Sequence, residues 1–195
     1  MFRRYPNHKY KLTYSIVIVK YSDYYGKKAA LQTAVDIAKN DIILFTDADA
    51  AVPTNWISSY NRFFSEDYGF VIGWIRGENI KNIKKFKRII SSGIFAAMAG
   101  LRKPFSCSGG NLAIRRKTLL EIGGYSSIKE SLSGDDKQLL GLVAKTEWKV
   151  AYNPDSRVIE RERDLTPSQD MNQALRHYGK FSMSSTFHKF FSIII

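Results

Sequence analysis

The sequence predicts one α/β domain in which helices flank a mixed, mostly parallel sheet. Short apolar runs that fit strands buried on both faces alternate with segments whose apolar residues recur at helical spacing. Residues 15–19 and 42–46 are two such runs, and the helical segment between them completes a β-α-β unit, for which a parallel pair is the strong default. A chain of 195 residues, 44% of them hydrophobic, is long enough to bury a sizeable core.

The apolar spacing predicts the elements in order along the chain. A helix opens at residues 26–28 with Leu31 and Val35 on its buried face, and a second helix begins at Pro53. The other predicted elements are strands at 69–75, 112–114 and 148–152, helices at 81–101, 116–122 and after 133–136, an exposed edge strand or loop at 157–164, and a last helix at 166–178. Residues 1–180 then form the domain. Residues 181–195 are an apolar tail that fits the start of a membrane helix or an element packed on the core.

The charge balance favours polyanionic partners. The chain carries 30 Lys and Arg against 18 Asp and Glu, a formal net charge of +12, which suits nucleic acid, an anionic membrane surface or phosphorylated small molecules. Basic residues gather at 81–88 beside apolar positions. This segment fits either a helix at a membrane interface or, as we prefer, a helix packed on the core with solvated lysines. The single cysteine, Cys107, excludes an intrachain disulfide.

Two acid clusters are the candidates for chemistry. Asp47 and Asp49 follow the predicted strand at 42–46, at the edge where open α/β sheets bind ligands. Clustered carboxylates there suit a divalent cation held on phosphate oxygens, although the same tripeptide is also common in turns. Asp135 and Asp136 begin a predicted helix, where a carboxylate often serves as a cap. In the chemical alternative, Asp136 takes the proton from an attacking hydroxyl as general base.

Two further segments offer ligand contacts. Ser108-Gly109-Gly110-Asn111 presents backbone amides with little side-chain obstruction, which suits close approach to a ligand but equally a plain tight turn. Gln173 and Arg176 lie three residues apart on one face of the last predicted helix. An amide and a guanidinium then converge on a diphosphate or sugar, unless that face is simply solvated.

In their order along the chain, these motifs resemble family 2 glycosyltransferases of the GT-A fold, a Rossmann-like architecture. The resemblance covers roughly residues 15–180 and implies transfer of a sugar, with inversion, from a nucleotide diphosphate sugar to an acceptor hydroxyl. It also implies a divalent metal, Mg2+ or Mn2+. The motifs are Gly26-Lys27-Lys28, Thr46-Asp47-Ala48-Asp49 with Pro53 and Trp56, Ser108-Gly109-Gly110-Asn111, Gly123-Gly124-Tyr125, Ser133-Gly134-Asp135-Asp136 with Leu139-Leu140, and Gln173-Ala174-Leu175-Arg176-His177.

The resemblance assigns a role to each candidate residue by its position. Asp136 is the catalytic base, and Asp49 and Asp47 hold the metal. The residues implied in donor binding are Asp47, Lys27, Gly109, Gly110 and Asn111. The residues implied in acceptor or diphosphate binding are Asp135, Gln173, Arg176 and His177. The family usually has a second Arg and a final Trp where this chain has Ala174 and His177.

Partners and location also follow from the resemblance. It implies a nucleotide diphosphate sugar donor, a glycan or lipid-linked acceptor, a role in polysaccharide biosynthesis, and a place at the cytoplasmic side of the cell membrane or in the cytoplasm. No nucleic-acid partner is expected, since the aromatic residues fall at core spacing. The family normally has a strand and a helix ahead of the segment at 15–19. We therefore expect that the first β-α unit is missing, that the chain is truncated at both ends, and that alone it binds nucleotide sugar poorly.

Two other functions stay open on the same residues. The first is a non-catalytic basic module, or an inactive fragment, that binds nucleic acid or an anionic membrane surface through its positive charge. The second is a phosphoryl or nucleotidyl transferase that uses the same two acid clusters.

Overall fold

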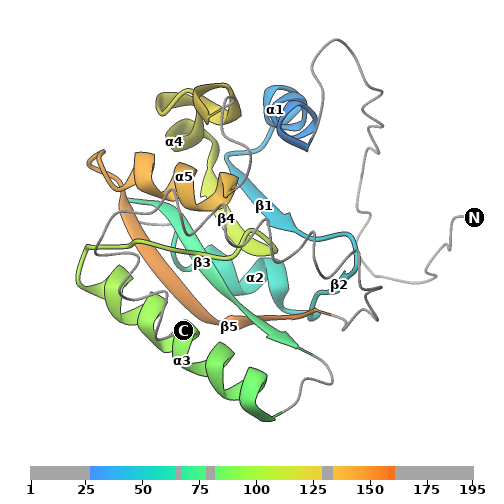
Figure 1. Cartoon of the computed structure of the whole chain (residues 1–195). Helices are drawn as coiled ribbons and strands as arrows, with labels where there is room; N and C mark the ends of the chain where they lie inside the picture. Colours follow the sequence, from blue (N-terminus) through green and yellow to red (C-terminus); the bar gives the residue numbers. More distant parts are fainter. Residues whose placement is uncertain (1–26, 65–66, 78–81, 129–133, 161–195) are drawn as a thin grey trace, which may run out of the picture.

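The computed structural model describes residues 27–64, 67–77, 82–128 and 134–160, without the side chains of 82–85. The helices are α1 (Lys27–Ile37), α2 (Trp56–Asn61), α3 (Asn82–Gly100), α4 (Arg116–Glu121) and α5 (Asp135–Val143), with a 3-10 helix, η1, at Gly124–Ile128. The strands are β1 (Ile42–Thr46), β2 (Ala50–Ala51), β3 (Tyr68–Gly77), β4 (Asn111–Arg115) and β5 (Lys149–Glu160). Figure 1 shows these strands as one sheet with helices around it.

The sheet is mixed, and its five described strands run in the order β1-β4-β3-β5-β2. Strands β3 and β5 are parallel, whereas β4 is antiparallel to both of its neighbours and β2 is antiparallel to β5. The α/β class and the mixed sheet are therefore confirmed. Within the described residues the parallel arrangement is confined to β3 and β5. The strand predicted at 15–19, the helix at 166–178 and the tail at 181–195 lie outside the described residues.

The core has two layers because side chains alternate between the faces of each strand. On one face Phe70 and Ile72 of β3 pack with helical residues such as Val35 and Leu139, so α1, α4, η1 and α5 cover this side. On the opposite face Val71 packs with Ala113 and Ala151, and the fully buried ring of Tyr60 brings α2 onto it. Helices thus cover both faces of the sheet, and the register of β1 with β4 aligns Thr46 with Asn111.

Strand β5 differs from its prediction. It runs unbroken from Lys149 to Glu160 and lies between β3 and β2, so residues 157–160 are no exposed edge, and Val158 is fully buried. Its register with β3 shifts between the pairs Gly73–Asn153 and Trp74–Arg157. This irregularity accommodates Pro154, which a regular interior strand would not accept because proline lacks a backbone N–H.

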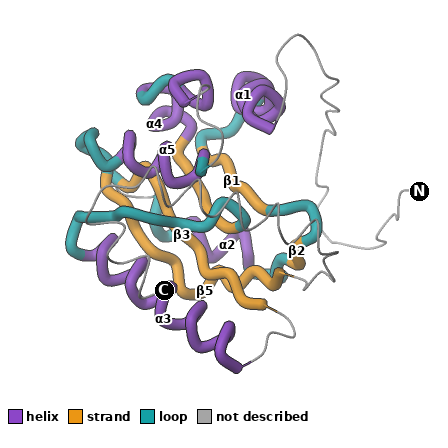
Figure 2. The backbone as a smooth tube through the Cα atoms, in the orientation of Figure 1, coloured by secondary structure: helices purple, strands orange, loops and turns teal. Residues whose placement is uncertain are grey.

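Helix α3 packs along β5 and β3, as expected for a helix that covers the core (Figure 2). Its Ser92 hydroxyl hydrogen-bonds to the hydroxyl of Tyr152, and Arg88 pairs with Glu160 at 2.8 Å. Ala99 is buried against the domain. Among the helices of the described residues, none has the length and apolar character needed to cross a membrane.

Candidate active site

The first acid cluster forms the turn that follows β1. The amide of Ala50 donates to the carbonyl of Asp47 at 3.1 Å, which closes the Asp47-Ala48-Asp49 segment between β1 and β2. The turn and the ligand site are therefore compatible, since the turn places the acids at the end of β1, whose residues are partly buried and whose last residue, Thr46, is exposed. The Asp47 carboxylate is half-exposed and lies 3.9 Å from the ammonium of Lys27 in the first turn of α1.

The second acid cluster meets the first across the glycine pair. An ideal Cβ on Gly110 would lie 2.5 Å from Asp47 Oδ2, and one on Gly109 would lie 3.4 Å from Asp136 Cγ. Two consecutive residues thus contact the two predicted functional carboxylates, one on each side. Only a residue without a side chain lets the Asp47 carboxylate approach the backbone at Gly110 so closely. The structure brings together Asp47, Gly109, Gly110 and Asp136 as the sequence predicts.

The side chain of Asn111 lies in the core, and the predicted role of this residue in donor binding stays a prediction. It is fully buried, and its Oδ1 accepts hydrogen bonds from Trp56 Nε1 at 2.9 Å, Tyr60 at 2.8 Å and Ser156 at 3.0 Å. Its Nδ2 donates to the carbonyls of Trp74 at 2.8 Å and Ser156 at 2.7 Å. With both of its polar atoms committed, this amide positions the loop between the acids.

Two consecutive lysines at the start of α1 each contact one of the two acid clusters. While Lys27 faces Asp47, the Lys28 ammonium lies 3.3 Å from Asp135 Oδ1 and donates to the carbonyl of Ile128 at 2.7 Å. Both Lys28 and Asp135 are largely buried. Asp135 ties the start of α5 to α1, and its predicted contact with the acceptor or diphosphate stays a prediction. The contact leaves Asp136, the next residue, on the side of Gly109.

Tyr125 ends the Gly123-Gly124-Tyr125 motif, and the sequence alone assigns it no role at the site. It is buried in η1, and its ring packs 6.2 Å from that of Phe45 in β1. Burial raises the pKa of the Tyr125 phenol well above its ordinary value, and the nearby charges of Asp135, Asp136 and Cys107 raise it further. Gln32 of α1 accepts from the Tyr125 amide at 2.7 Å and fixes the segment. A neutral phenol therefore stands beside the second acid cluster.

The donor atoms available suit a metal held jointly with a ligand. No group of three or more His, Cys, Asp or Glu side chains in the described residues could enclose an ion. Mg2+ and related cations are commonly held by one or two carboxylates plus substrate phosphates, so a carboxylate turn such as Asp47-Ala48-Asp49 fits that type of site. Gln173, Arg176 and His177 lie outside the described residues.

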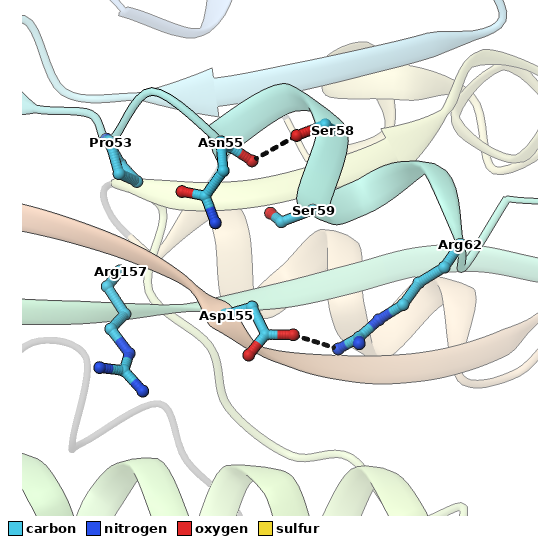
Figure 3. Close-up of a pocket in the computed structure, with 7 residues that line it drawn as sticks. All are labelled: Pro53, Asn55, Ser58, Ser59, Arg62, Asp155 and Arg157. Carbon is cyan, nitrogen blue, oxygen red and sulfur yellow. Dashed lines mark hydrogen bonds and ion pairs between the residues drawn. The ribbon is translucent and has the colours of Figure 1, made fainter.

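A polar cleft of about 470 Å3 lies away from the two acid clusters, between α2 and β5. Figure 3 shows the Arg62–Asp155 ion pair, at 2.9 Å, on one of its walls. The Arg157 guanidinium lies over the Trp74 ring at 5.2 Å. Neither Asp47 nor Asp136 lines this cleft, so we do not include it in the candidate active site. Its lining residues are Pro53, Asn55, Ser58, Ser59, Arg62, Asp155 and Arg157.

Comparison with solved structures shows the fold. A mannosyltransferase from Pyrobaculum calidifontis in complex with GDP-Man and Mn2+ is 19% identical with a TM-score of 0.61, over 87% of this chain and 47% of that one. GalNAc-T7 with UDP, GalNAc and Mn2+ is 18% identical with a TM-score of 0.51, over 71% of this chain and 31% of that one. The predicted glycosyltransferase fold is thus confirmed, and the chain spans less than half the length of either structure.

Comparison of sequences shows the family. No curated protein matches the chain. The sequence model described as Glycosyl transferase family 2, however, matches residues 6–132, well over half of the chain. This match contains β1, the Asp47-Ala48-Asp49 turn and the glycine pair, and it ends before Asp135. The chain therefore belongs to the glycosyl transferase family 2.

Proposed function

We propose that this protein transfers a sugar from a nucleoside diphosphate sugar to an acceptor hydroxyl, with inversion at the anomeric carbon. The observation that carries the proposal is the placement of Asp47 and Asp136 on the two sides of Gly109-Gly110. Family membership and the fold support it. The arrangement offers one carboxylate for a cation on the donor's phosphates and a second for the acceptor's proton, with unobstructed backbone between them.

In this proposal Asp136 is the general base. It accepts the proton of the acceptor hydroxyl while that oxygen attacks the anomeric carbon, and the nucleoside diphosphate leaves from the opposite face. Asp135 and Lys28 fix the start of α5 and so the direction of the Asp136 carboxylate. The buried Tyr125 stays a neutral phenol near this base and so adds no charge beside it.

We assign Asp47 and Asp49 to a divalent cation and Lys27 to the donor's phosphates. Bound there, Mg2+ or Mn2+ would neutralise the charge that develops on the leaving diphosphate. The solved structures that share the fold contain Mn2+, which supports this assignment. Lys27 is mostly exposed and already faces Asp47, so its ammonium can turn toward a diphosphate without a burial cost.

Acceptor binding and location complete the proposal. We assign the acceptor or diphosphate contacts to Gln173, Arg176 and His177, and the acceptor class to glycans or lipid-linked sugars of polysaccharide biosynthesis. We place the protein at the cytoplasmic side of the cell membrane. The net charge of +12 supports a partner surface rich in phosphate.

The test is release of nucleoside diphosphate from a panel of UDP and GDP sugars, with and without Mn2+, in the presence of candidate acceptors. We expect release with at least one donor only when Mn2+ is present. Asp47→Asn and Asp136→Asn should each reduce it by at least a hundredfold. Asp155→Asn is the matched control, because this half-exposed acid pairs with Arg62 in the separate cleft and should keep normal activity.

Two results would contradict the proposal. The first is donor turnover that survives both active-site substitutions. The second is metal-independent, salt-sensitive binding of nucleic acid that persists in the double variant, because that behaviour belongs to a basic binding module. Transfer of a phosphoryl or nucleotidyl group in place of the sugar would be seen directly as a different product.

A further inference from the structure

The outward side of α3 is an open, uncharged surface. The side chains of Phe86 and Ile89 are 63% and 50% exposed, and Leu101, just after the helix, is 68% exposed. An ideal Cβ built on Gly93 or Gly100 meets no atom within 4 Å, so both positions have open space among the described residues. These residues recur at three- and four-residue spacing and therefore share one face. We call Phe86, Ile89, Gly93, Ala97, Gly100 and Leu101 the α3 face.

Helix α3 and the two residues after Leu101 carry only positive charges, one of which, Arg88, is paired with Glu160 of β5. Residues 82–103 contain no Asp or Glu, while Lys84, Lys85, Lys87, Arg88, Arg102 and Lys103 stand at the two ends of this stretch. The side chains of Lys87, Arg102 and Lys103 are exposed. The opposite side of the helix is fixed on the domain by Ser92, Arg88 and Ala99. A rigid helix thus presents an apolar strip between two basic ends.

We propose that the α3 face docks on an anionic membrane surface. An apolar strip with basic ends matches the boundary between acyl chains and negatively charged headgroups, where Phe and Leu insert and Lys and Arg meet phosphates. The face belongs to one exposed side of a single helix, which suits a flat bilayer better than a peptide. This inference deepens the proposed function by naming the surface that places the enzyme at a membrane, and it does not depend on the chemistry of transfer.

The test is co-sedimentation of the full chain with vesicles, without donor or metal. Vesicles of phosphatidylcholine alone are compared with vesicles containing 30% phosphatidylglycerol, at low and high salt. We expect binding to the anionic vesicles that weakens at high salt. Gly93→Glu should weaken it at least tenfold, because it places a charge in the middle of the α3 face at a position with open space. Gly93→Leu should strengthen it severalfold.

Control variants separate insertion of the α3 face from non-specific adsorption of the chain to vesicles. Gly93→Ala changes neither charge nor fit and should bind like the unmodified chain. Ile57→Ser removes an equally exposed apolar residue, 66% exposed on α2, and should also bind normally. In addition, a polarity-sensitive dye attached to the cysteine of Leu101→Cys should shift its fluorescence emission to the blue when vesicles are added. The same dye on Ile57→Cys should show no such shift. The native Cys107 is buried and reacts slowly.

Three outcomes would overturn the inference. They are absence of binding by the unmodified chain, binding that Gly93→Glu leaves unchanged, and light scattering that shows the α3 face joining two copies of the chain. Asp136→Asn should keep full vesicle binding. Loss of transfer together with intact binding would count against the proposed function alone, and loss of binding with intact transfer to a soluble acceptor would count against the α3 face alone.

Discussion

At the residue scale, the glycine pair between the acids has two members with different tolerance for a side chain. Gly110→Ala would place its Cβ 2.5 Å from Asp47 Oδ2 and 3.0 Å from Ile75, so the half-exposed carboxylate must move. We expect a loss of sugar transfer of at least tenfold with a change in unfolding free energy of only about 1 kcal/mol. Activity assays and urea unfolding of the same preparation measure both quantities.

Gly109→Ala is the matched control for that substitution. Its Cβ would meet Asp136 at 3.4 Å, which is ordinary contact distance, and activity should stay within about threefold of normal. Equal losses in both variants would show that the loop needs flexibility and not the close approach of Asp47.

Asn111 offers a second test at this scale, because structural and ligand-binding roles predict different losses. Asn111→Ala leaves the buried hydroxyls of Tyr60 and Ser156, the Trp56 indole and two carbonyls without their partner. We expect a destabilisation of about 3 kcal/mol or more in urea unfolding. Asn55→Ala, at an exposed position before α2, should cost almost nothing. A stable Asn111→Ala variant with weak donor binding would support the donor-binding role.

At the element scale, α1 and α5 begin with opposite charges. Lys27 and Lys28 stand in the first turn of α1, where cations oppose the helix dipole, whereas Asp135 and Asp136 begin α5, where anions are favoured. The local cost in α1 is offset by long-range pairing, since Lys28 reaches Asp135 and the carbonyl of Ile128. The two lysines therefore orient α5 and the turn after β1 from one helix.

Substitution of the two adjacent lysines should change the free energy of unfolding by very different amounts. Lys28→Met breaks a largely buried ion pair and should cost about 2 kcal/mol, with a coupling to Asp135→Asn of about 1 kcal/mol or more in a double-mutant cycle. Lys27→Met breaks an exposed contact at 3.9 Å and should cost less than about 0.5 kcal/mol. Additive effects of the Lys28 and Asp135 substitutions would mean that the pair does not hold α5.

The elements that sequence patterns predicted well are those whose stabilising contacts follow from local periodicity. The strand at 42–46 and the helices α4 and α5 appear as expected, with Gly123 at φ 81° after α4. Strand β2 has two residues and carries no pattern of its own. The continuation of β5 past Pro154 depends on a register shift against β3, which no local signal contains. Elements made by partners distant in sequence were therefore the ones missed.

The residues of the candidate site are predictable from the sequence to the same extent as the elements of the fold. Carboxylates that follow a strand or begin a helix are visible in the sequence, and the glycine pair marks a close approach, so the sequence predicts Asp47, Asp136 and Gly110 as candidates. The roles of Asn111, Asp135 and Tyr125 depend on contacts with α2, α1 and β1 that form only in three dimensions. A side chain whose hydrogen bonds are all made inside the protein and a side chain that binds a ligand look alike in the sequence.

At the scale of the whole molecule, the layers around the sheet share one sensitivity to alkali. Tyr60 lies in α2, Tyr125 lies in η1, and Tyr152 of β5 contacts Ser92 of α3. Burial raises the pKa of each phenol above its ordinary value, so the folded state keeps these protons while the unfolded chain loses them near pH 10. Their contribution to stability is complete below that pH and declines as the pH rises above it.

We therefore expect the free energy of unfolding to fall above about pH 10 by up to about 1.4 kcal/mol per pH unit for each such phenol. Urea unfolding between pH 8 and 11, with tyrosinate absorbance followed in parallel, measures the slope and shows whether ionisation coincides with unfolding. Tyr125→Phe removes one buried phenolic hydroxyl and keeps the ring, which is held mainly by packing. It should therefore reduce the slope of unfolding free energy against pH by the contribution of one titrating group. Two results would contradict the burial of Tyr60, Tyr125 and Tyr152. They are a pH slope that Tyr125→Phe leaves unchanged, and ionisation of all eleven tyrosines before the chain unfolds.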